Sequence, residues 1–151
     1  MEPLTLPSSG SIYLDTSALI YSVERNEPYL ALLAPAWQQA EAGELVVVCS
    51  ELAIAETLVL PIREGNRELE TAFRNVFAAP EVRVTPVTRQ LWEDTARLRA
   101  ATGLKTPDAL HAATALQAEC LLFVTNDTDF RRVDGLPVTI LDDLLNETDP
   151  A

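Results

Sequence analysis

The stretch LVVVC at residues 45–49 is the best starting point for the fold. A continuous apolar run with three valines is typical of a strand that is buried on both faces of a parallel sheet. A second run of this kind, LLFVT, occupies residues 121–125. Shorter strand candidates lie at residues 12–14, 82–85 and 138–141. The sequence therefore predicts a sheet of four or five strands.

Helical patterns separate these strands. We expect helices at residues 28–42, 50–60, 67–78 and 88–101, and one more that opens at Thr106-Pro107. Ser50 and Thr106 are the expected N-caps, with Pro107 at the first helical position. Strands alternating with helices of about ten residues indicate βαβ units. The predicted fold class is α/β, with three layers and a central parallel sheet flanked by helices.

A chain of 151 residues predicts one domain, residues 1–151, with an ordered core at about 11–145. Residues 1–10 and about 146–151 are polar or rich in Pro and Ser, so we expect loose ends. Cys49 and Cys120 fit no zinc or disulfide pattern and are interpreted as small buried residues. The single histidine, His111, excludes a multi-histidine metal site.

The chain contains no apolar run that could span a membrane and no signal peptide at its start, so a cytoplasmic location is expected. Its net charge of −12 is unusual for a protein that holds nucleic acid, because a strongly acidic surface repels a polyanion. Two interpretations remain open. Either the substrate is not nucleic acid, or metal ions and a few arginines reverse the field inside one cleft.

Carboxylates occur in four segments where the predicted fold brings chain ends together. Asp15 follows the first strand, Glu56 lies on the helix after the second, Asp108 lies in the first turn of a helix, and Asp127 and Asp129 follow the last long strand. Ligands of parallel sheets gather at the carboxyl ends of the strands. Oxygen ligands suit Mg²⁺ or Mn²⁺, and a divalent cation offsets the repulsion between carboxylates. Such metals activate water and stabilise the leaving oxygen in phosphodiester cleavage.

Each of these acids also has an ordinary structural explanation. Asp15 is a suitable N-cap, and Glu56 could lie on a solvated helix face. Asp108 is favoured by the helix dipole, and Asp127 by a turn after a strand. The metal-site hypothesis therefore depends on the four segments together.

The same segments resemble those of PIN-domain proteins, in particular the VapC-like toxins of toxin–antitoxin pairs. The resemblance extends over nearly the whole chain and rests on YLDTSAL at residues 13–19, Glu56, TPDALHAA at 106–113 and TNDTDF at 125–130. It implies a sheet in the order 3-2-1-4-5. It also implies that Asp15, Glu56, Asp108 and Asp127 form the catalytic metal site, with Asp129 as a rival for the fourth position.

The resemblance further implies endonucleolytic cleavage of RNA with Mg²⁺ or Mn²⁺ as cofactor, a homodimer, and a small antitoxin partner whose basic residue enters the acidic site. Ser17 or Thr16 would orient the first carboxylate. Lys105 is the best candidate for a contact with a substrate phosphate. We interpret His111 as a partly buried histidine with a satisfied hydrogen bond, in preference to a general base.

Three alternatives are weighed against a nuclease. A phosphatase of the haloacid dehalogenase type needs a second Asp two residues after the first, and Ser17 stands there. A receiver domain of the response-regulator type needs two adjacent acids after the first strand, which the sequence lacks. A PIN fold that acts only as a binding or scaffold protein is kept open by the net charge of −12.

Overall fold

The computed structural model of the chain describes residues 1–146. Of the loose end expected at about 146–151, Asn146 ends a helix and the remainder lies outside the described residues. The elements in chain order are β1 (Ser11–Leu14), α1 (Thr16–Val23), α2 (Tyr29–Glu41), β2 (Val46–Ser50), α3 (Leu52–Glu64), α4 (Arg67–Ala78), β3 (Val82–Thr85), α5 (Arg89–Thr102), α6 (Thr106–Gln117), β4 (Phe123–Thr125), the 3-10 helix η1 (Thr128–Arg132), β5 (Val138–Ile140) and α7 (Leu141–Asn146).

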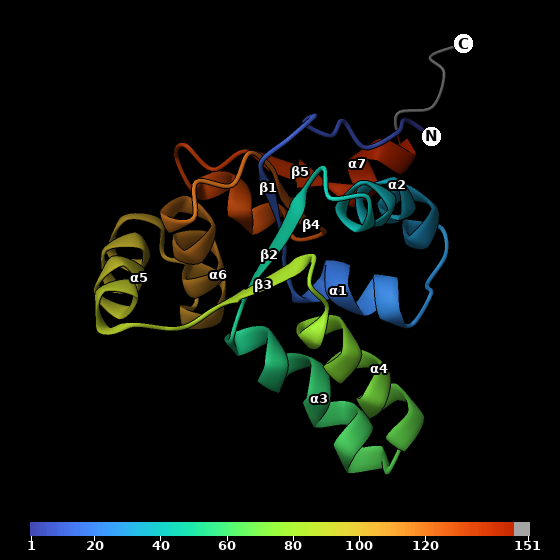
Figure 1. The fold of residues 1–151 in the computed structure, drawn as a ribbon. Helices are drawn as coiled ribbons and strands as arrows, with labels where there is room; N and C mark the ends of the chain where they lie inside the picture. Colours follow the sequence, from blue (N-terminus) through green and yellow to red (C-terminus); the bar gives the residue numbers. More distant parts are fainter. Residues whose placement is uncertain (147–151) are drawn as a thin grey trace.

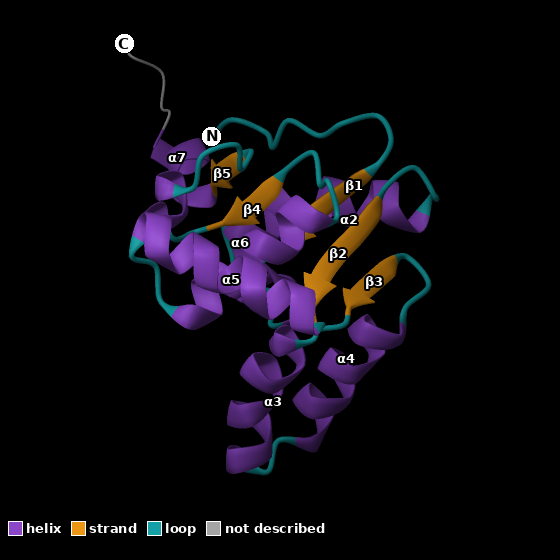
Figure 2. Cartoon of the chain, turned by 90° about the vertical axis from the view of Figure 1, so that its left-hand side faces the viewer, coloured by secondary structure: helices purple, strands orange, loops and turns teal. Residues whose placement is uncertain are grey.

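The five strands form one parallel sheet in the order β3-β2-β1-β4-β5, as predicted (Figure 2). The chain first adds β2 and β3 on one side of β1, and later adds β4 and β5 on the other. The first strand is therefore central, and the sheet has its topological switch point beside the carboxyl end of β1. Ligand sites of open α/β sheets lie at such a point.

Alternate residues of β1 face opposite layers of helices, as the pleat of a strand requires. Ile12 and Leu14 belong to a core cluster that also contains residues of α1 and α2. Tyr13 belongs to a cluster on the other face, together with residues of α6. Figure 1 shows α5 and α6 on one side of the sheet and α1 and α2 on the other, while α3 and α4 project beyond its end. The predicted three layers are confirmed.

Helix α3 differs from its prediction at both ends. Its N-cap position is Glu51, without a side-chain cap, whereas the hydroxyl of Ser50 accepts a hydrogen bond from the backbone N–H of Leu52 at 3.1 Å. The helix also continues through Pro61, which is buried, and ends at Gly65. Gly65 has φ of 67°, a left-handed conformation that glycine adopts without steric cost.

Smaller differences occur later in the chain. Helix α6 begins one residue earlier than predicted, with Lys105 and not Thr106 at the N-cap position. Strand β4 begins at Phe123, and Leu121 is 56% exposed although a buried strand was predicted there. Leu141, expected at the end of the last strand, instead begins α7, which the sequence analysis did not predict.

The chain start is also more ordered than expected. Leu4 is buried in the core, and the backbone N–H of Glu2 donates to the carbonyl of Leu144. Cys49 and Cys120 are both buried free cysteines, as predicted. Within residues 1–146, no helix is both long and apolar enough to cross a membrane.

Candidate metal centre

A pocket of about 310 Å³ opens at the carboxyl end of the sheet. It collects side chains from the residue after β1, from α1, α3 and α6, from the turn after β4 and from η1. The lining residues are Asp15, Thr16, Ser17, Tyr21, Glu56, Asp108, His111, Asn126, Asp127 and Phe130. All four carboxylates predicted from separate segments therefore line one pocket, although they are up to 112 positions apart in the chain.

Asp15 is the most buried of these acids. It is 6% exposed and caps α1, because its Oδ1 accepts from the hydroxyl of Ser17 at 2.7 Å and from the backbone N–H of Ala18 at 3.0 Å. Its Oδ2 accepts from the hydroxyl of Thr125 at 2.5 Å. Burial raises the pKa of Asp15, and these three hydrogen bonds oppose that rise. The N-cap explanation and a place in the pocket thus both apply to Asp15.

Glu56 lies in the second turn of α3 and is half-buried. Its Oε1 accepts from the hydroxyl of Thr16 at 2.6 Å and lies 2.7 Å from Nε2 of His111. Burial opposes ionisation, but the hydrogen bonds from His111 and Thr16 outweigh it and lower the pKa of Glu56. Of the two candidates for orienting Asp15, Ser17 does so, whereas Thr16 holds Glu56.

Asp108 and Asp127 complete the group. Asp108 lies in the first turn of α6, and its pKa is raised by burial first and then by the negative charge of Asp127. Further repulsion comes from Glu56 and Asp129. Asp127 caps η1, with its Oδ1 accepting from the backbone N–H of Asp129 at 2.9 Å. Negative charge is therefore concentrated in this pocket at a cost to the folded protein.

Asp129, the rival for the fourth position, does not line the pocket. Its side chain is 50% exposed and forms an ion pair with Arg132 at 3.1 Å. The geometry thus favours Asp127 over Asp129 as the acid that meets the other three.

The donor set fits a hydrated divalent cation. Among the described residues, no three His, Cys, Asp or Glu side chains are arranged as a ready-made metal site. Mg²⁺, however, usually keeps several waters and is bound through one or two carboxylates. The mutual repulsion that raises the pKa of Asp108 is the kind of penalty that a cation removes. Mg²⁺ or Mn²⁺ held partly through water therefore suits these residues.

Several residues of the site were not singled out from the sequence. Thr125, at the end of β4, donates to Asp15, and its hydroxyl also accepts from the backbone N–H of Asp127 at 3.0 Å. Asn126 lines the pocket and donates to the hydroxyl of Tyr21 at 3.3 Å. Threonine and asparagine after a strand carry no distinctive pattern, so only the pairing of β1 with β4 reveals these contacts.

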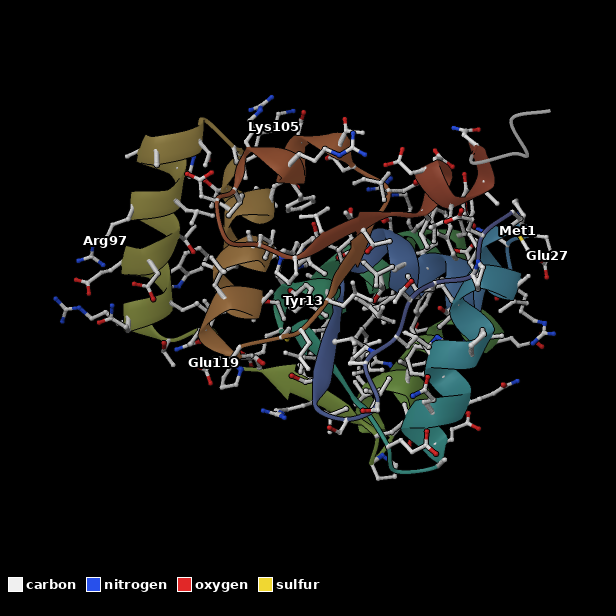
Figure 3. All side chains as sticks on the ribbon, turned by 90° about the horizontal axis from the view of Figure 1, so that it is seen from above. Met1, Tyr13, Glu27, Arg97, Lys105 and Glu119 are labelled. Carbon is white, nitrogen blue, oxygen red and sulfur yellow. The ribbon has the colours of Figure 1, made fainter. Side chains whose placement is uncertain are left out.

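No lysine or arginine within residues 1–146 lines the pocket. Arg131 and Arg132 pair with Asp143 and Asp129. Lys105 is exposed at the N-cap of α6 and forms no ion pair within residues 1–146. Figure 3 shows Lys105 at the periphery of the molecule.

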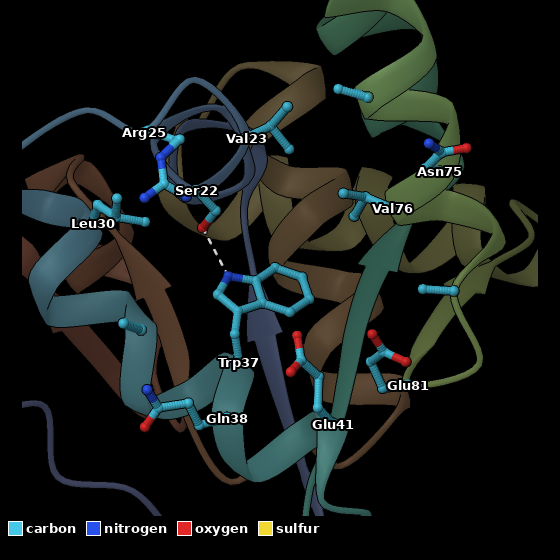
Figure 4. Close-up of a pocket in the computed structure, with 13 residues that line it drawn as sticks. Ser22, Val23, Arg25, Leu30, Trp37, Gln38, Glu41, Asn75, Val76 and Glu81 are labelled. Atoms are coloured by element: carbon cyan, nitrogen blue, oxygen red, sulfur yellow. Dashed lines mark hydrogen bonds between the residues drawn. The ribbon is translucent and has the colours of Figure 1, made fainter.

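A second hollow, of about 510 Å³, lies between α1, α2 and α4 (Figure 4). Trp37 is at its centre and donates from Nε1 to the hydroxyl of Ser22 at 2.8 Å. Leu30 and Val76 add apolar surface, and Glu41 and Glu81 add negative charge. None of the four predicted site residues lines it.

Comparisons with known proteins agree with this architecture. The family model described as "PIN domain" matches residues 12–136. No curated protein sequence matches the chain significantly. Among solved structures, VapBC2 from Rickettsia felis bound to a promoter DNA fragment has a TM-score of 0.66 at 18% identity, over 85% of this chain and 98% of that one.

Two further structures are similar. VapC20 from Mycobacterium tuberculosis, a toxin that cleaves the sarcin-ricin loop, has a TM-score of 0.65 at 22% identity, over 80% of this chain and 92% of that one. FitAcB from Neisseria gonorrhoeae has a TM-score of 0.59 at 25% identity, over 84% and 95% of the two chains.

Proposed function

This chain belongs to the PIN domain family, and from that premise we propose that it is a metal-dependent endoribonuclease, the toxin of a toxin–antitoxin pair acting on RNA in the cytoplasm. In this proposal residues 1–151 act as a single PIN domain. Similarity to structures of VapC-type toxins and toxin–antitoxin complexes supports the assignment.

One observation carries the proposal. Asp15, Glu56, Asp108 and Asp127 come from four segments and line the same pocket at the switch point of the sheet. Acids without a function would not be expected to lie so close together, because burial and the neighbouring carboxylates raise the pKa of Asp108 and make its ionised form unfavourable. Assembling charge at a cost to folding is typical of a functional site.

Asp15 and Asp108 would hold the principal Mg²⁺ or Mn²⁺, and Glu56 and Asp127 would complete the site directly or through water. When bound, a divalent cation lowers the pKa of water and offsets negative charge on a phosphodiester. The hydrogen bonds within the protein orient the carboxylates that would bind this cation. Asp15 is fixed by hydrogen bonds on both oxygens, and so needs no rearrangement when a ligand arrives.

The net charge of −12 limits where RNA can approach. Two arginines near the pocket already have acidic partners, whereas Lys105 forms no ion pair within residues 1–146. Lys105 precedes Asp108 by three positions. We therefore assign Lys105 to a contact with a substrate phosphate, with the metal ions supplying the remaining positive charge.

The proposed protein partners are a small antitoxin and a second copy of this chain. The hollow around Trp37 combines an apolar lining with Glu41 and Glu81, which favours a partner segment with apolar and basic residues. Val59, Leu60 and Ile62 are about half exposed on α3, and exposed apolar side chains grouped on one element are typical of an interface. We assign this face of α3 to the homodimer.

A catalytically silent binding or scaffold protein is the second candidate. It is favoured by the finding that no three metal-binding side chains within residues 1–146 converge as a ready-made site. It differs from the nuclease in one measurable respect, because a scaffold has no need to bind Mn²⁺.

The test is cleavage of labelled single-stranded RNA by the purified protein with Mn²⁺, with Mg²⁺ or with EDTA, alongside Asp15→Asn. We expect cleavage that requires metal and disappears in the variant. Cleavage that persists in folded Asp15→Asn would contradict the assigned site. Absence of cleavage on every RNA, together with no affinity for Mn²⁺, would favour the scaffold.

A further inference from the structure

His111 lies at the middle of a hydrogen-bond chain that links four elements. It is 3% exposed and belongs to α6. Its Nδ1 lies 2.6 Å from the hydroxyl of Tyr13 in β1, and its Nε2 lies 2.7 Å from Oε1 of Glu56 in α3. The hydroxyl of Thr16 in α1 donates to the same Oε1 at 2.6 Å. Both imidazole nitrogens thus meet groups from other parts of the fold.

The acceptor chemistry determines which nitrogen carries the hydrogen toward Glu56. An ionised carboxylate can only accept hydrogen bonds, and the hydrogen bonds to Glu56 lower its pKa. The bond at Nε2 therefore requires an Nε2–H donor. Nδ1 then faces the hydroxyl of Tyr13, which can donate to it. Glu56 in α3 therefore sets the tautomer of His111, and Tyr13 on the central strand faces the other nitrogen.

Tyr13 anchors the hydrogen-bond chain to the core of the sheet. It is fully buried, and its ring stacks on that of Phe123 with centroids 5.0 Å apart and planes 3° apart. Figure 3 shows Tyr13 in the interior, well inside the exposed Arg97 and Glu119. Because Tyr13 is fixed by β1, the imidazole that it contacts is fixed relative to the sheet.

We infer that His111 is a positioning residue for the metal site: it holds Glu56 through Oε1 and leaves Oε2 to the cation or to its bound water. This inference rests on the proposed function, because Glu56 is there assigned to the metal. Outer partners that orient metal-binding side chains are a general feature of such sites. Oε2 accepts no hydrogen bond from residues 1–146, whereas Oε1 is shared by two donors.

Packing alone does not explain His111. Its neighbours on α6, Leu110 and Ala112, are buried apolar residues that fill the same layer. Thr114, one turn later, is buried as well, but its hydroxyl donates within the helix to the carbonyl of Leu110 at 2.6 Å. Among the hydrogen bonds of residues 1–146, only those of the imidazole link α6 to Tyr13 and Glu56, so Thr114 provides a matched control.

The first experiment reads the imidazole directly. Because the chain has one histidine, an untagged protein gives a single imidazole signal set in a long-range ¹H–¹⁵N spectrum. In metal-free protein we expect hydrogen on Nε2, and a changed Nε2 signal in Glu56→Ala. Tyr13→Phe should shift the Nδ1 signal. An Nε2 without hydrogen in the wild type, or imidazole signals that are the same in Glu56→Ala and wild type, would overturn the inference.

The second experiment measures Mn²⁺ affinity by calorimetry in His111→Leu, His111→Gln and Thr114→Val. We expect His111→Leu to bind Mn²⁺ roughly 10–100-fold more weakly. His111→Gln keeps an N–H donor and should recover most of that affinity. Thr114→Val should lose thermal stability but keep wild-type affinity. Circular dichroism would identify any variant that does not fold. If His111→Leu does not fold, the Mn²⁺ affinity of His111→Gln decides: an affinity close to that of wild type supports the positioning role, and a large loss contradicts it.

The results separate the two proposals. If wild type binds Mn²⁺ and folded His111→Leu binds it equally well, the positioning role is overturned while the metal site stands. If wild type binds neither Mn²⁺ nor Mg²⁺, the proposed function fails, and the positioning role toward a cation fails with it, whatever the imidazole spectrum shows.

Discussion

Thr125 ends β4 and Asp15 directly follows β1, and the hydroxyl of Thr125 donates to Oδ2 of Asp15 at 2.5 Å. Both residues are buried, so the bond joins two strands beneath the acidic pocket. Thr125→Val keeps the side-chain shape but removes the donor. Leaving a buried carboxylate short of a partner costs about 1–3 kcal/mol. Urea denaturation at neutral pH should show a loss of stability of this size.

Thr139→Val is the matched control for that prediction. Thr139 lies on β5, is only partly buried, and its hydroxyl makes no hydrogen bond within residues 1–146. The same substitution there should change stability little. If Thr125→Val costs no more than Thr139→Val, the bond to Asp15 contributes nothing to the fold.

Asp108→Asn is expected to stabilise the metal-free protein at neutral pH. Burial, and then the charge of Asp127, raise the pKa of Asp108. The folded protein therefore keeps that proton to a higher pH than the unfolded chain does, and stability falls as pH rises through the folded pKa. Asparagine remains uncharged at every pH, so the variant avoids this loss of stability. The difference in melting temperature should vanish below the ordinary pKa of 3.8, where both side chains are neutral.

Glu44→Gln removes one negative charge from an exposed position remote from the pocket and controls for the change in net charge. It should have a smaller effect than Asp108→Asn. An equal gain in both variants would mean that relief of the overall charge of −12, and not of the pocket, is responsible.

Divalent cations should stabilise wild type, and the gain should rise with the logarithm of the ratio of free cation to Kd. A ligand present at 100 times its Kd adds about 2.7 kcal/mol to the free energy of unfolding. Differential scanning fluorimetry with MnCl₂ should therefore show a rise in melting temperature for wild type and little rise for Asp15→Asn or Asp108→Asn. An equal rise in all three proteins would point to binding outside the pocket.

Leu60→Glu should shift the protein from dimer to monomer, since it places a charge among the exposed apolar side chains of α3 that are assigned to the interface. Size-exclusion chromatography with light scattering measures the mass. Leu121→Glu adds the same charge at another exposed leucine and should leave the mass unchanged. A wild type that is monomeric at all concentrations would remove the basis for the assigned face.

The sequence predicted the framework because its signals are local. Buried runs gave the strands, and a carboxylate after a strand lies at the sheet's carboxyl edge whatever follows it, as for Asp15 and Asp127. The order of the strands came from the family resemblance. The C-terminal end of α3 was misjudged because the helix continues through a buried Pro61, which packing tolerates and no local pattern reveals.

The contacts within the site could not be predicted in the same way. The sequence predicted a partly buried His111 with a satisfied hydrogen bond, and the structure shows hydrogen bonds at both nitrogens but buries the side chain more fully. Which groups satisfy them depends on how α6 packs against β1 and α3. The partner of Thr16 was equally ambiguous, because Asp15 is adjacent in sequence and Glu56 is adjacent only in space.

The order of the four acids along the chain determines when the acidic pocket can form during translation. A nascent chain that extends through α5 has Asp15 and Glu56, but it lacks Asp108 and Asp127 and the strand that carries Thr125. Chains fold from the N-terminus as the ribosome releases them. The pocket can therefore form only after α6 and β4 have emerged from the ribosome, well after the central strand of the sheet has been made.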